Sequence, residues 1–340
     1  MIKSKTLLSV FYTSLLFFPL SCTTDYGSGT EPTQTKSAKV IGYLSSDNFS
    51  KIGSIQFCKL THLNLAFANP NADGSIHFQG SIDAVIQYVK SVNPNIKISI
   101  SLAGGAITQE QATNWSLYID NSSNRPILIR NIVAFVNRYH LDGVDVDLEW
   151  DAVTSGYSGF ILELKTALAK NDKLLTAALP NNFRFQNISD PALNAFDFIN
   201  IMSYDSTGPW TPNQPGQHSS ILNAQNGVDF WHQQQHIPTS KLTLGVPFYG
   251  YNFVDSPVSS STFGQIVESG VQHADLDQVG QLYYNGRPTI SKKVEYASQN
   301  TGGIMIWEIS QDSFSTYSLL DVIHKKYSSL GYTTTGLCGN

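Results

Sequence analysis

The chain has 340 residues with 21 basic and 26 acidic side chains, which give a formal net charge of −5, and charged residues make up only 14%. Hydrophobic residues reach 41%, so the composition excludes an intrinsically disordered protein. The acidic balance argues against nucleic-acid binding, which needs a basic face, and three cysteines exclude a disulfide scaffold. The uncharged polar residues that remain for the surface suit neutral, hydroxyl-rich partners.

The first 21 residues have the features of an export signal. Two lysines precede an apolar run over residues 7–20, which is too short and too interrupted for a membrane-spanning helix. Residues 19–22, Pro-Leu-Ser-Cys, are similar to a bacterial lipoprotein cleavage box, with proline where leucine is usual. We therefore expect export and a lipid anchor on Cys22, at the outer membrane or cell surface, with plain secretion as the alternative. The polar residues 22–38 predict a flexible tether.

The spacing of cysteine and histidine indicates no cofactor. Cys58 and Cys338 could form a disulfide in an oxidising compartment; the alternative is that Cys58 is a small buried hydrophobic residue. The eight histidines form no strong metal-ligand pattern. No Gly-x-Gly-x-x-Gly follows the first predicted strand and no Walker loop occurs, so nucleotide binding has no support. We expect neither a metal nor another cofactor.

Short β-rich runs alternate with helical patterns from residue 39 onward. Apolar residues at i, i+3, i+4 and i+7 predict helices within 82–89, 128–139 and 157–168. Strands that alternate with helices indicate parallel pairing with the helices outside. Eight such units predict an α/β fold, a (β/α)8 TIM barrel over residues 39–330 followed by a tail at 331–340, with a doubly wound open sheet as the alternative. The predicted strands are 40–43, 62–68, 97–102, 143–149, 174–179, 198–204, 242–248 and 303–307.

Four acids fall within the eight residues from Asp142 to Glu149. Because side chains alternate along a strand, Asp145, Asp147 and Glu149 share one face, with about 6.6 Å between successive Cα atoms, and the intervening apolar residues share the other. In a barrel the acids would point inward, where confinement should raise a pKa and keep at least one acid protonated. Glu149 lies at the C-terminal end, where barrel active sites open, and is a natural general acid.

The acids have two other interpretations. A solvated, charged strand conflicts with the intervening valines and leucine and with Trp150 directly after the acids. A hard-metal site made of three carboxylates is the second. Acids that are stacked along one strand converge poorly on a single ion, so catalysis is the favoured interpretation.

The spacing Asp142-Gly143-x-Asp145-x-Asp147-x-Glu149 resembles the signature of family 18 glycoside hydrolases, which include chitinases. The resemblance covers residues 39–327, because other segments agree in order with barrel strands of that family. It implies a TIM barrel that hydrolyses polymers of N-acetylglucosamine. The matching segments, for strands one, two, six, seven and eight, are Val40-Ile-Gly-Tyr43, Thr61-His-Leu-Asn-Leu-Ala-Phe67, Met202-Ser-Tyr-Asp205, Leu244-Gly-Val-Pro-Phe-Tyr-Gly250 and Gly302-Gly-Ile-Met-Ile-Trp307.

The third strand departs from the family pattern. The family usually has Ser-x-Gly-Gly there, whereas this chain has Ser101-Leu-Ala-Gly-Gly105. Alignment on the two glycines places Leu102 at the serine position, which would change the packing near Asp145.

The resemblance implies a role for each residue of the motif. Glu149 would protonate the glycosidic oxygen, Asp147 would turn toward the substrate acetamide and orient it, and Asp145 would share a proton with Asp147. The acetamide carbonyl would be the nucleophile, giving an oxazolinium intermediate and retention, which makes this family an exception to the two-carboxylate rule. The hydroxyl of Tyr204 would hold that carbonyl for attack. Two residues are expected to be structural: Asp142 and Gly143.

Several side chains near strand ends are candidates for binding the sugar. The resemblance implies that Asp205 binds the sugar or the acetamide region, and that Trp307 forms the floor of the subsite beside the scissile bond. Aromatic faces suit the C–H surfaces of sugars. The other candidates, with a place in the core as the alternative for Phe67 and Tyr249, are Met202, Tyr43, Phe67, Trp150, Trp210, Tyr249 and Tyr251.

Only a small insertion separates the seventh and eighth predicted strands. It lies within residues 252–301, and residues 281–287 have the pattern of a strand and turn. Many family members insert a larger α+β domain at this point. We therefore expect a shallower cleft and endo-type cleavage, by a monomer.

Three functions are consistent with these features. The favoured one is a chitinase that cleaves β-1,4-linked N-acetylglucosamine in chitin or chito-oligosaccharides, because the segments 202–205 and 244–250 look chitinase-like. The second is an endo-β-N-acetylglucosaminidase acting on N-glycans. The third is a non-catalytic chitin-binding, lectin-like barrel; such relatives typically lose the last acid of the motif, and Glu149 is present here.

Overall fold

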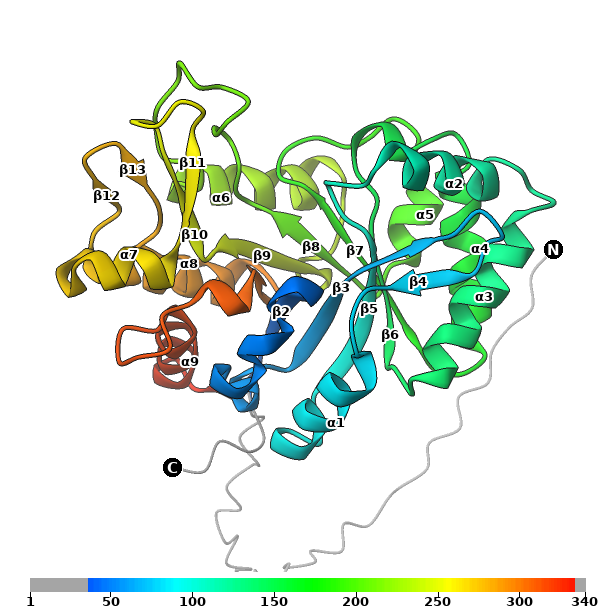
Figure 1. Cartoon of the computed structure of the whole chain (residues 1–340), viewed down its shortest axis with the longest axis horizontal. Helices are drawn as coiled ribbons and strands as arrows, with labels where there is room; N and C mark the ends of the chain where they lie inside the picture. The colour runs from blue at the N-terminus through cyan, green and yellow to red at the C-terminus, as the bar shows by residue number, and fades with distance from the viewer. Residues whose placement is uncertain (1–35, 334–340) are drawn as a thin grey trace, which may run out of the picture. The chain divides into compact units, whose positions relative to one another are not determined.

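The computed structural model of the protein describes residues 36–333 (Figure 1). The expected export signal, the lipid-anchor candidate Cys22 and most of the expected tether lie outside the described residues. Cys58 is disulfide-bonded, so it is not the small buried thiol of the alternative interpretation. Cys338, the candidate partner from the sequence, is also outside the described residues.

Within residues 36–333, eight parallel strands form a closed barrel, as predicted, rather than an open sheet. Each strand pairs with its neighbours in chain order, β14 pairs with both β9 and β2, and the β2–β3 pairing completes the circle. The barrel strands are β2 (Lys39–Ser45), β3 (His62–Pro70), β5 (Lys97–Ala103), β6 (Gly143–Asp147), β7 (Leu174–Pro180), β8 (Phe198–Met202), β9 (Leu242–Pro247) and β14 (Gly303–Trp307).

Helices surround the barrel strands (Figure 1). The three helices predicted from periodicity are present as α1, α3 and α4, and α2 begins with a capping box in which Thr108 and Gln111 satisfy each other's backbone N–H groups. Among the described residues, no helix has the length and apolar character needed to cross a membrane. The helices are α1 (Ile82–Val92), α2 (Gln109–Ile119), α3 (Arg125–Arg138), α4 (Tyr157–Ala169), α5 (Asp190–Ala195), α6 (Ile221–Asp229), α7 (Phe263–Ser269), α8 (Arg287–Asn300) and α9 (Leu319–Ser329).

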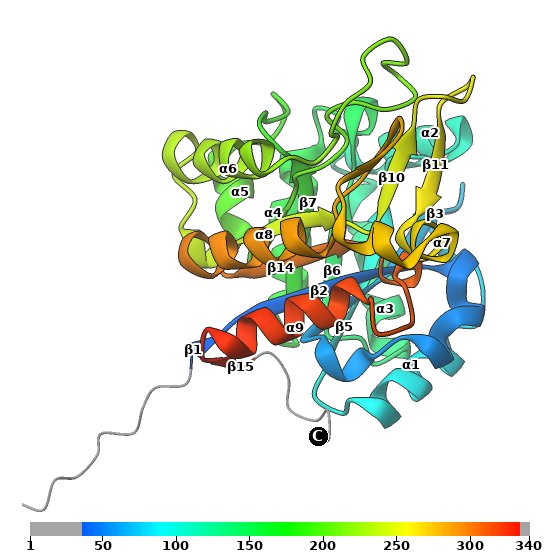
Figure 2. The same cartoon turned by 90° about the vertical axis from the view of Figure 1, so that its left-hand side faces the viewer.

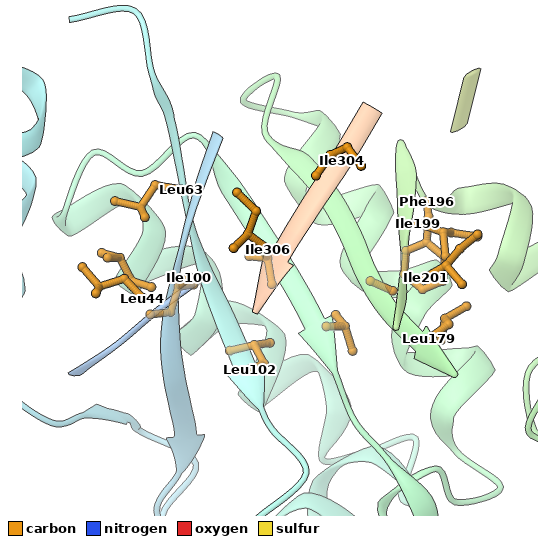
Figure 3. Close-up of a cluster of buried hydrophobic side chains, with 14 of the residues drawn as sticks. Leu44, Leu63, Ile100, Leu102, Leu179, Phe196, Ile199, Ile201, Ile304 and Ile306 are labelled. Carbon is orange, nitrogen blue, oxygen red and sulfur yellow. The ribbon is translucent and has the colours of Figure 1, made fainter. Parts of the chain in front are cut away.

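Side-chain alternation along the barrel strands produces two separate apolar clusters. Outward-facing residues such as Leu102 and Ile306 pack between the strands and the helices (Figure 3). A smaller cluster, which includes Tyr43, Phe198 and Met305, fills the barrel interior. The acids of β6 share the inward side, because Val144 and Val146 belong to the outer cluster.

The two ends of the described chain lie together. Residues 36–37 form strand β1 (Lys36–Ser37), which pairs in parallel with β15 (Tyr332–Thr333) at the end of α9 (Figure 2). The Lys36 ammonium lies 5.6 Å from the centre of the Tyr332 ring. Both segments were expected to be tether and tail, so the folded domain extends slightly beyond the predicted limits at each end.

The insertion before the last barrel strand is small, as expected, but it forms a sheet of its own (Figure 1). Four short antiparallel strands in the order β11-β10-β13-β12 stand at one end of the barrel, followed by α8. The predicted strand and turn at 281–287 correspond to β13 and the start of α8. The strands are β10 (Tyr249–Asn252), β11 (Ser259–Thr262), β12 (Gln278–Val279) and β13 (Leu282–Tyr283). One further strand outside the barrel, β4 (Ile76–Phe78), forms a hairpin with β3.

Candidate active site

The three acids that were predicted to share a face do so. Asp145 and Asp147 are buried inside the barrel. Strand β6 ends at Asp147, two residues earlier than predicted, but Glu149 keeps an extended backbone (φ −123°, ψ 159°). The alternation therefore continues, and Glu149 is the half-buried member of the series at the barrel mouth.

Asp145 lies within a shell of hydrogen-bond donors. Its Oδ2 accepts hydrogen bonds from Tyr43 Oη (2.7 Å) and Ser101 Oγ (2.8 Å). Its Oδ1 accepts from Thr176 Oγ1 (2.6 Å) and Asn200 Nδ2 (3.2 Å). Burial raises the pKa of Asp145, and these four hydrogen bonds oppose the rise. Donors from four other barrel strands, β2, β5, β7 and β8, thus favour the ionised form of this carboxyl.

The third strand places Ser101, and not Leu102, beside Asp145. Ser101 pairs in register with Asp145, whereas Leu102 points outward into the core between strands and helices. Alignment on the two glycines was therefore wrong by one residue. The extra residue is accommodated after the serine, where Ala103 and Gly104 both have positive φ values, 75° and 84°.

Asp147 differs from Asp145 in its surroundings. Its Oδ1 is buried and has no hydrogen-bond partner among the described residues. Burial, followed by the charges of Glu149 and Asp145, raises the pKa of Asp147 well above its usual value. Because Asp145 already accepts four hydrogen bonds and Asp147 Oδ1 accepts none, Asp147 has the higher proton affinity of the two carboxyls.

Glu149 has the proton affinity expected of a general acid. Burial raises its pKa from 4.5 to about 7, and the negative charge of Asp205 adds to the rise. Gly105 leaves the space for this carboxyl, since a Cβ atom at residue 105 would lie 2.5 Å from Glu149 Oε1. A carboxyl with a pKa near 7 retains its proton in a large share of molecules at neutral pH, so it can donate that proton to a leaving group.

Asp142 and Gly143 lie at the other end of β6, where their contacts are structural. Asp142 accepts hydrogen bonds from Lys90 Nζ (3.2 Å), Lys97 Nζ (3.2 Å) and the backbone N–H of Ile98 (2.9 Å). A Cβ atom at Gly143 would lie 2.6 Å from the carbonyl oxygen of Leu174, so only glycine fits this close approach of β6 and β7.

Tyr204 and Met202 both belong to the interior side of the barrel, as predicted. Both side chains pack against the inner cluster. Within residues 36–333, the hydroxyl of Tyr204 makes only a weak contact, 3.8 Å from Met305 Sδ. Burial, followed by the charges of Asp147 and Asp205, raises the pKa of Tyr204 well above its usual value, so the hydroxyl keeps its hydrogen and can donate it.

Asp205 follows Tyr204 with a left-handed backbone (φ 61°), a conformation that aspartate adopts more readily than most residues. Its Oδ1 accepts hydrogen bonds from Tyr249 Oη (2.5 Å) and Tyr251 Oη (3.1 Å), and lies 3.2 Å from His218 Nδ1. Tyr249 was a candidate for sugar contact, but it is buried and its hydroxyl is engaged by Asp205.

Trp307 is part of an aromatic group at the end of β14. Its ring stacks on Phe67 with centroids 5.6 Å apart and meets the edge of Tyr43 at 5.8 Å. Tyr43 is only 1% exposed, so it belongs to the hydrogen-bond network below the acids and not to an accessible sugar surface. The next residue, Glu308, is buried and accepts a hydrogen bond from Asn48 (2.7 Å), which fixes the chain that follows Trp307.

Two predicted tryptophans are exposed. Trp150 is 61% exposed and lies beside Phe183 and Phe185, with centroids 5.8 and 6.0 Å from its own. These three aromatics line a groove together with Arg184 and neighbouring polar residues. Trp210 is 55% exposed and meets the edge of Tyr251 at 5.7 Å.

Sequence reasoning missed several residues of the site. The donors to Asp145 on β5, β7 and β8 are polar residues at inward positions of predicted strands, so strand parity could have identified them: Ser101, Thr176 and Asn200. The role of Gly105 follows only from its distance to Glu149. The remaining missed residues lie on loops, where no periodicity marks them: Phe183, Phe185 and His218.

Comparisons with known proteins identify relatives of this chain. The sequence profile described as "Glycosyl hydrolases family 18" matches residues 39–312. The GH18 chitinase ChiB from the chitin utilization locus of Flavobacterium johnsoniae has 67% sequence identity and a TM-score of 0.88, over 90% of this chain and 98% of that chain. A chitinase from Bacteroides thetaiotaomicron has 31% identity and a TM-score of 0.77, over 88% and 99% of the two chains.

The chain matches only part of several curated relatives. An Endochitinase of Manduca sexta is 30% identical over 190 residues, which cover 48% of this chain and 34% of that relative. This chain therefore spans about a third of the length of that protein. The profile match over residues 39–312 and the high identity to a solved GH18 structure lead to one conclusion: the chain belongs to the glycosyl hydrolases family 18.

Proposed function

We propose that this protein hydrolyses β-1,4-linked N-acetylglucosamine in chitin or chito-oligosaccharides, with retention of configuration. The observation that supports this most strongly is the contrast among the three inward acids. Asp145 is saturated with donors, Asp147 has an unpartnered buried oxygen, and Glu149 at the mouth has a pKa near 7. Acetamide-assisted hydrolysis uses an ionised inner acid, a middle acid that can bind the acetamide and a protonated acid at the mouth.

Each step of the proposed reaction uses one of these groups. Glu149 donates its proton to the glycosidic oxygen, which breaks the bond to the leaving sugar. The acetamide carbonyl oxygen attacks the anomeric carbon and forms an oxazolinium ion, while Asp147 accepts a hydrogen bond from the acetamide N–H and Tyr204 donates one to the carbonyl oxygen. Glu149, now ionised, removes a proton from the water that opens the ring.

The proposed substrate agrees with the exposed side chains at the mouth. Trp307 offers a half-buried aromatic face beside the acids, and Trp150 and Trp210 offer exposed faces farther out. The small insertion sheet β10–β13 adds only short strands to one side of the mouth. We propose on this basis a shallow cleft and endo-type cleavage.

A side-by-side digestion tests the substrate. Chitin oligosaccharides and a high-mannose glycoprotein are incubated separately with the protein, and with Glu149→Gln, and the products are identified by mass spectrometry. Chitin cleavage that the variant loses supports the proposal, and a mixture of product lengths at the earliest times supports endo action. Glycan release without chitin cleavage would select an endo-β-N-acetylglucosaminidase, and binding of chitin without any cleavage would select a lectin-like protein.

The acetamide-assisted step has its own test in Asp147→Asn. The amide cannot share a proton with Asp145 or accept the acetamide N–H in the same way, so kcat should fall about 100-fold or more. Near wild-type turnover in this variant would refute acetamide assistance.

We also propose that the protein is exported, anchored through lipid on Cys22, and monomeric. The support for export and the anchor is the sequence of residues 1–22: the short interrupted apolar run and the cysteine after a small residue. Metabolic labelling with a radioactive fatty acid tests the anchor, with Cys22→Ser as the control. Label in the wild type that the variant lacks supports the anchor, and an unlabelled, released wild type supports plain secretion.

A further inference from the structure

We propose that His218 is a positioning residue that holds the Asp205 carboxylate in the orientation from which it acts on Glu149. His218 lies on the loop that follows β8, and no motif in the sequence marks it. This inference concerns the proton on Glu149, and rests on the proposed function only where turnover is measured.

Both ring nitrogens of His218 are engaged although the side chain is fully buried. Nε2 lies 3.3 Å from the carbonyl oxygen of Tyr249, which can only accept, so Nε2 has the hydrogen. Nδ1 lies 3.4 Å from the backbone N–H of Asp205, which donates to it, and 3.2 Å from Asp205 Oδ1. The neutral tautomer with hydrogen on Nε2 satisfies both the carbonyl and the backbone donor.

This arrangement fixes the backbone of Asp205 directly, and its carboxylate through the two tyrosines that pack against His218. Asp205 has a left-handed φ of 61°, and the bond from its N–H to His218 stabilises that conformation. Its Oδ1 accepts hydrogen bonds from Tyr249 and Tyr251, whose rings pack against His218, while Oδ2 has no hydrogen-bond partner in residues 36–333. One oxygen is therefore used to orient the group and the other stays available at the site.

The His218 ring is itself rigidly held. It packs against Tyr249 and Tyr251 with centroids 5.1 and 5.0 Å away. The next residue, Ser219, donates from Oγ to the Ser203 carbonyl oxygen at 2.6 Å and accepts hydrogen bonds from the buried ammonium of Lys293 at 2.6 and 2.7 Å. The loop therefore cannot shift relative to β8 without breaking several buried hydrogen bonds.

Asp205 is linked to catalysis by the electrostatic effect of its charge on Glu149. Burial, followed by the negative charge of Asp205, raises the pKa of Glu149 to about 7. The titratable groups facing His218 are Asp205, Tyr249 and Tyr251, with Lys293 one hydrogen bond beyond Ser219. A carboxylate that loses its orientation can turn into solvent, where its effect on Glu149 falls.

Two amide variants of His218 distinguish the roles of its two ring nitrogens. In His218→Asn the amide replaces Nδ1 and keeps the contact with Asp205, whereas in His218→Gln it replaces Nε2 and keeps only the contact with Tyr249. The exposed histidine on β4 provides a control, His77→Gln. The titration of Glu149 is followed by 13C NMR of protein labelled on glutamate carboxyl carbons, with Glu149→Gln to assign the resonance. This readout does not require turnover.

We expect His218→Gln to lower the pKa of Glu149 by about half a unit or more, and His218→Asn and His77→Gln to leave it near the wild-type value. On chito-oligosaccharides, the ratio of kcat/KM at pH 8 to that at pH 5 should fall about threefold or more in His218→Gln alone. An unchanged or raised Glu149 titration in His218→Gln would overturn the proposal. Equal effects of Asn and Gln would also overturn it, because they would indicate packing alone. Failure of the wild type to cleave chitin would refute the proposed function and leave the NMR comparison decisive.

Discussion

A Cβ atom at Gly105 would lie 2.5 Å from Oε1 of Glu149. Real Cβ atoms do not approach an oxygen so closely, so a side chain at residue 105 and the observed position of the Glu149 carboxyl exclude each other. The absence of a side chain at the second glycine after β5 therefore permits the observed position of the proton donor.

The Gly105→Ala variant should lower kcat by about 10- to 100-fold with a much smaller change in KM, because the displaced carboxyl no longer meets the glycosidic oxygen. Steady-state kinetics on chito-oligosaccharides measures this split. Gly53→Ala is the matched control, since nothing lies within 4 Å of a Cβ atom there. Equal kinetics for the two alanine variants would show that Glu149 has room to adapt.

The rate should depend on pH through Glu149. Because its pKa is raised to about 7, the protonated acid is lost as pH rises through about 7, and kcat should fall tenfold per pH unit above that value. The pH profile of kcat on a soluble chito-oligosaccharide checks this. A basic limb that begins above pH 9, or no basic limb at all, would contradict Glu149 as the proton donor.

The raised pKa of Glu149 also has a cost for stability. Between about pH 4.5 and 7 the folded state keeps a proton on this carboxyl that the unfolded state has released, so the free energy of unfolding falls as pH rises through this range. The Glu149→Gln variant lacks this pH-dependent fall in the free energy of unfolding. Its stability relative to wild type should increase by about 1–3 kcal/mol from pH 4 to pH 8, after allowance for partial exposure.

Urea unfolding at both pH values measures this difference. The control is Glu268→Gln, an exposed carboxylate on α7. A Glu149→Gln difference that does not change with pH would mean that Glu149 titrates normally in the folded protein.

The exposed aromatic group of Trp150, Phe183 and Phe185 should bind long substrates in preference to short ones. Trp150→Ala removes the most exposed ring of the three, so KM for a hexamer should rise about 5- to 10-fold while KM for a trimer changes little. The exposed Phe314→Ala provides a control for loss of a surface ring. A uniform rise for both lengths would place Trp150 beside the scissile bond.

The fold and the acids were predictable from the sequence because both depend on local alternation. A period of two on β6 put Asp145, Asp147 and Glu149 on one face, and the same rule would have found Ser101 and Thr176. The error at Leu102 arose because the extra residue is absorbed by positive φ values at Ala103 and Gly104, which the letters Ala-Gly do not specify.

Sequence reasoning was less successful where a side chain's partner comes from a distant element. Tyr43 looked like a sugar platform at a strand end, but its hydroxyl reaches across the barrel interior to Asp145. His218 and Phe183 lie on loops after β8 and β7, whose paths depend on packing rather than on a repeating pattern. Strands β1 and β15 are two residues each, too short for periodicity to detect.

Substrate-assisted retention is most directly tested by the anomeric configuration of the first products. The protein is mixed with a chitin hexamer in the NMR tube, and the new reducing ends are observed before they mutarotate. An oxazolinium intermediate that is opened by water from the leaving-group side predicts new ends in the β configuration. New ends that appear first as the α anomer would mean direct displacement by water, and would contradict the roles assigned to Asp147 and Glu149.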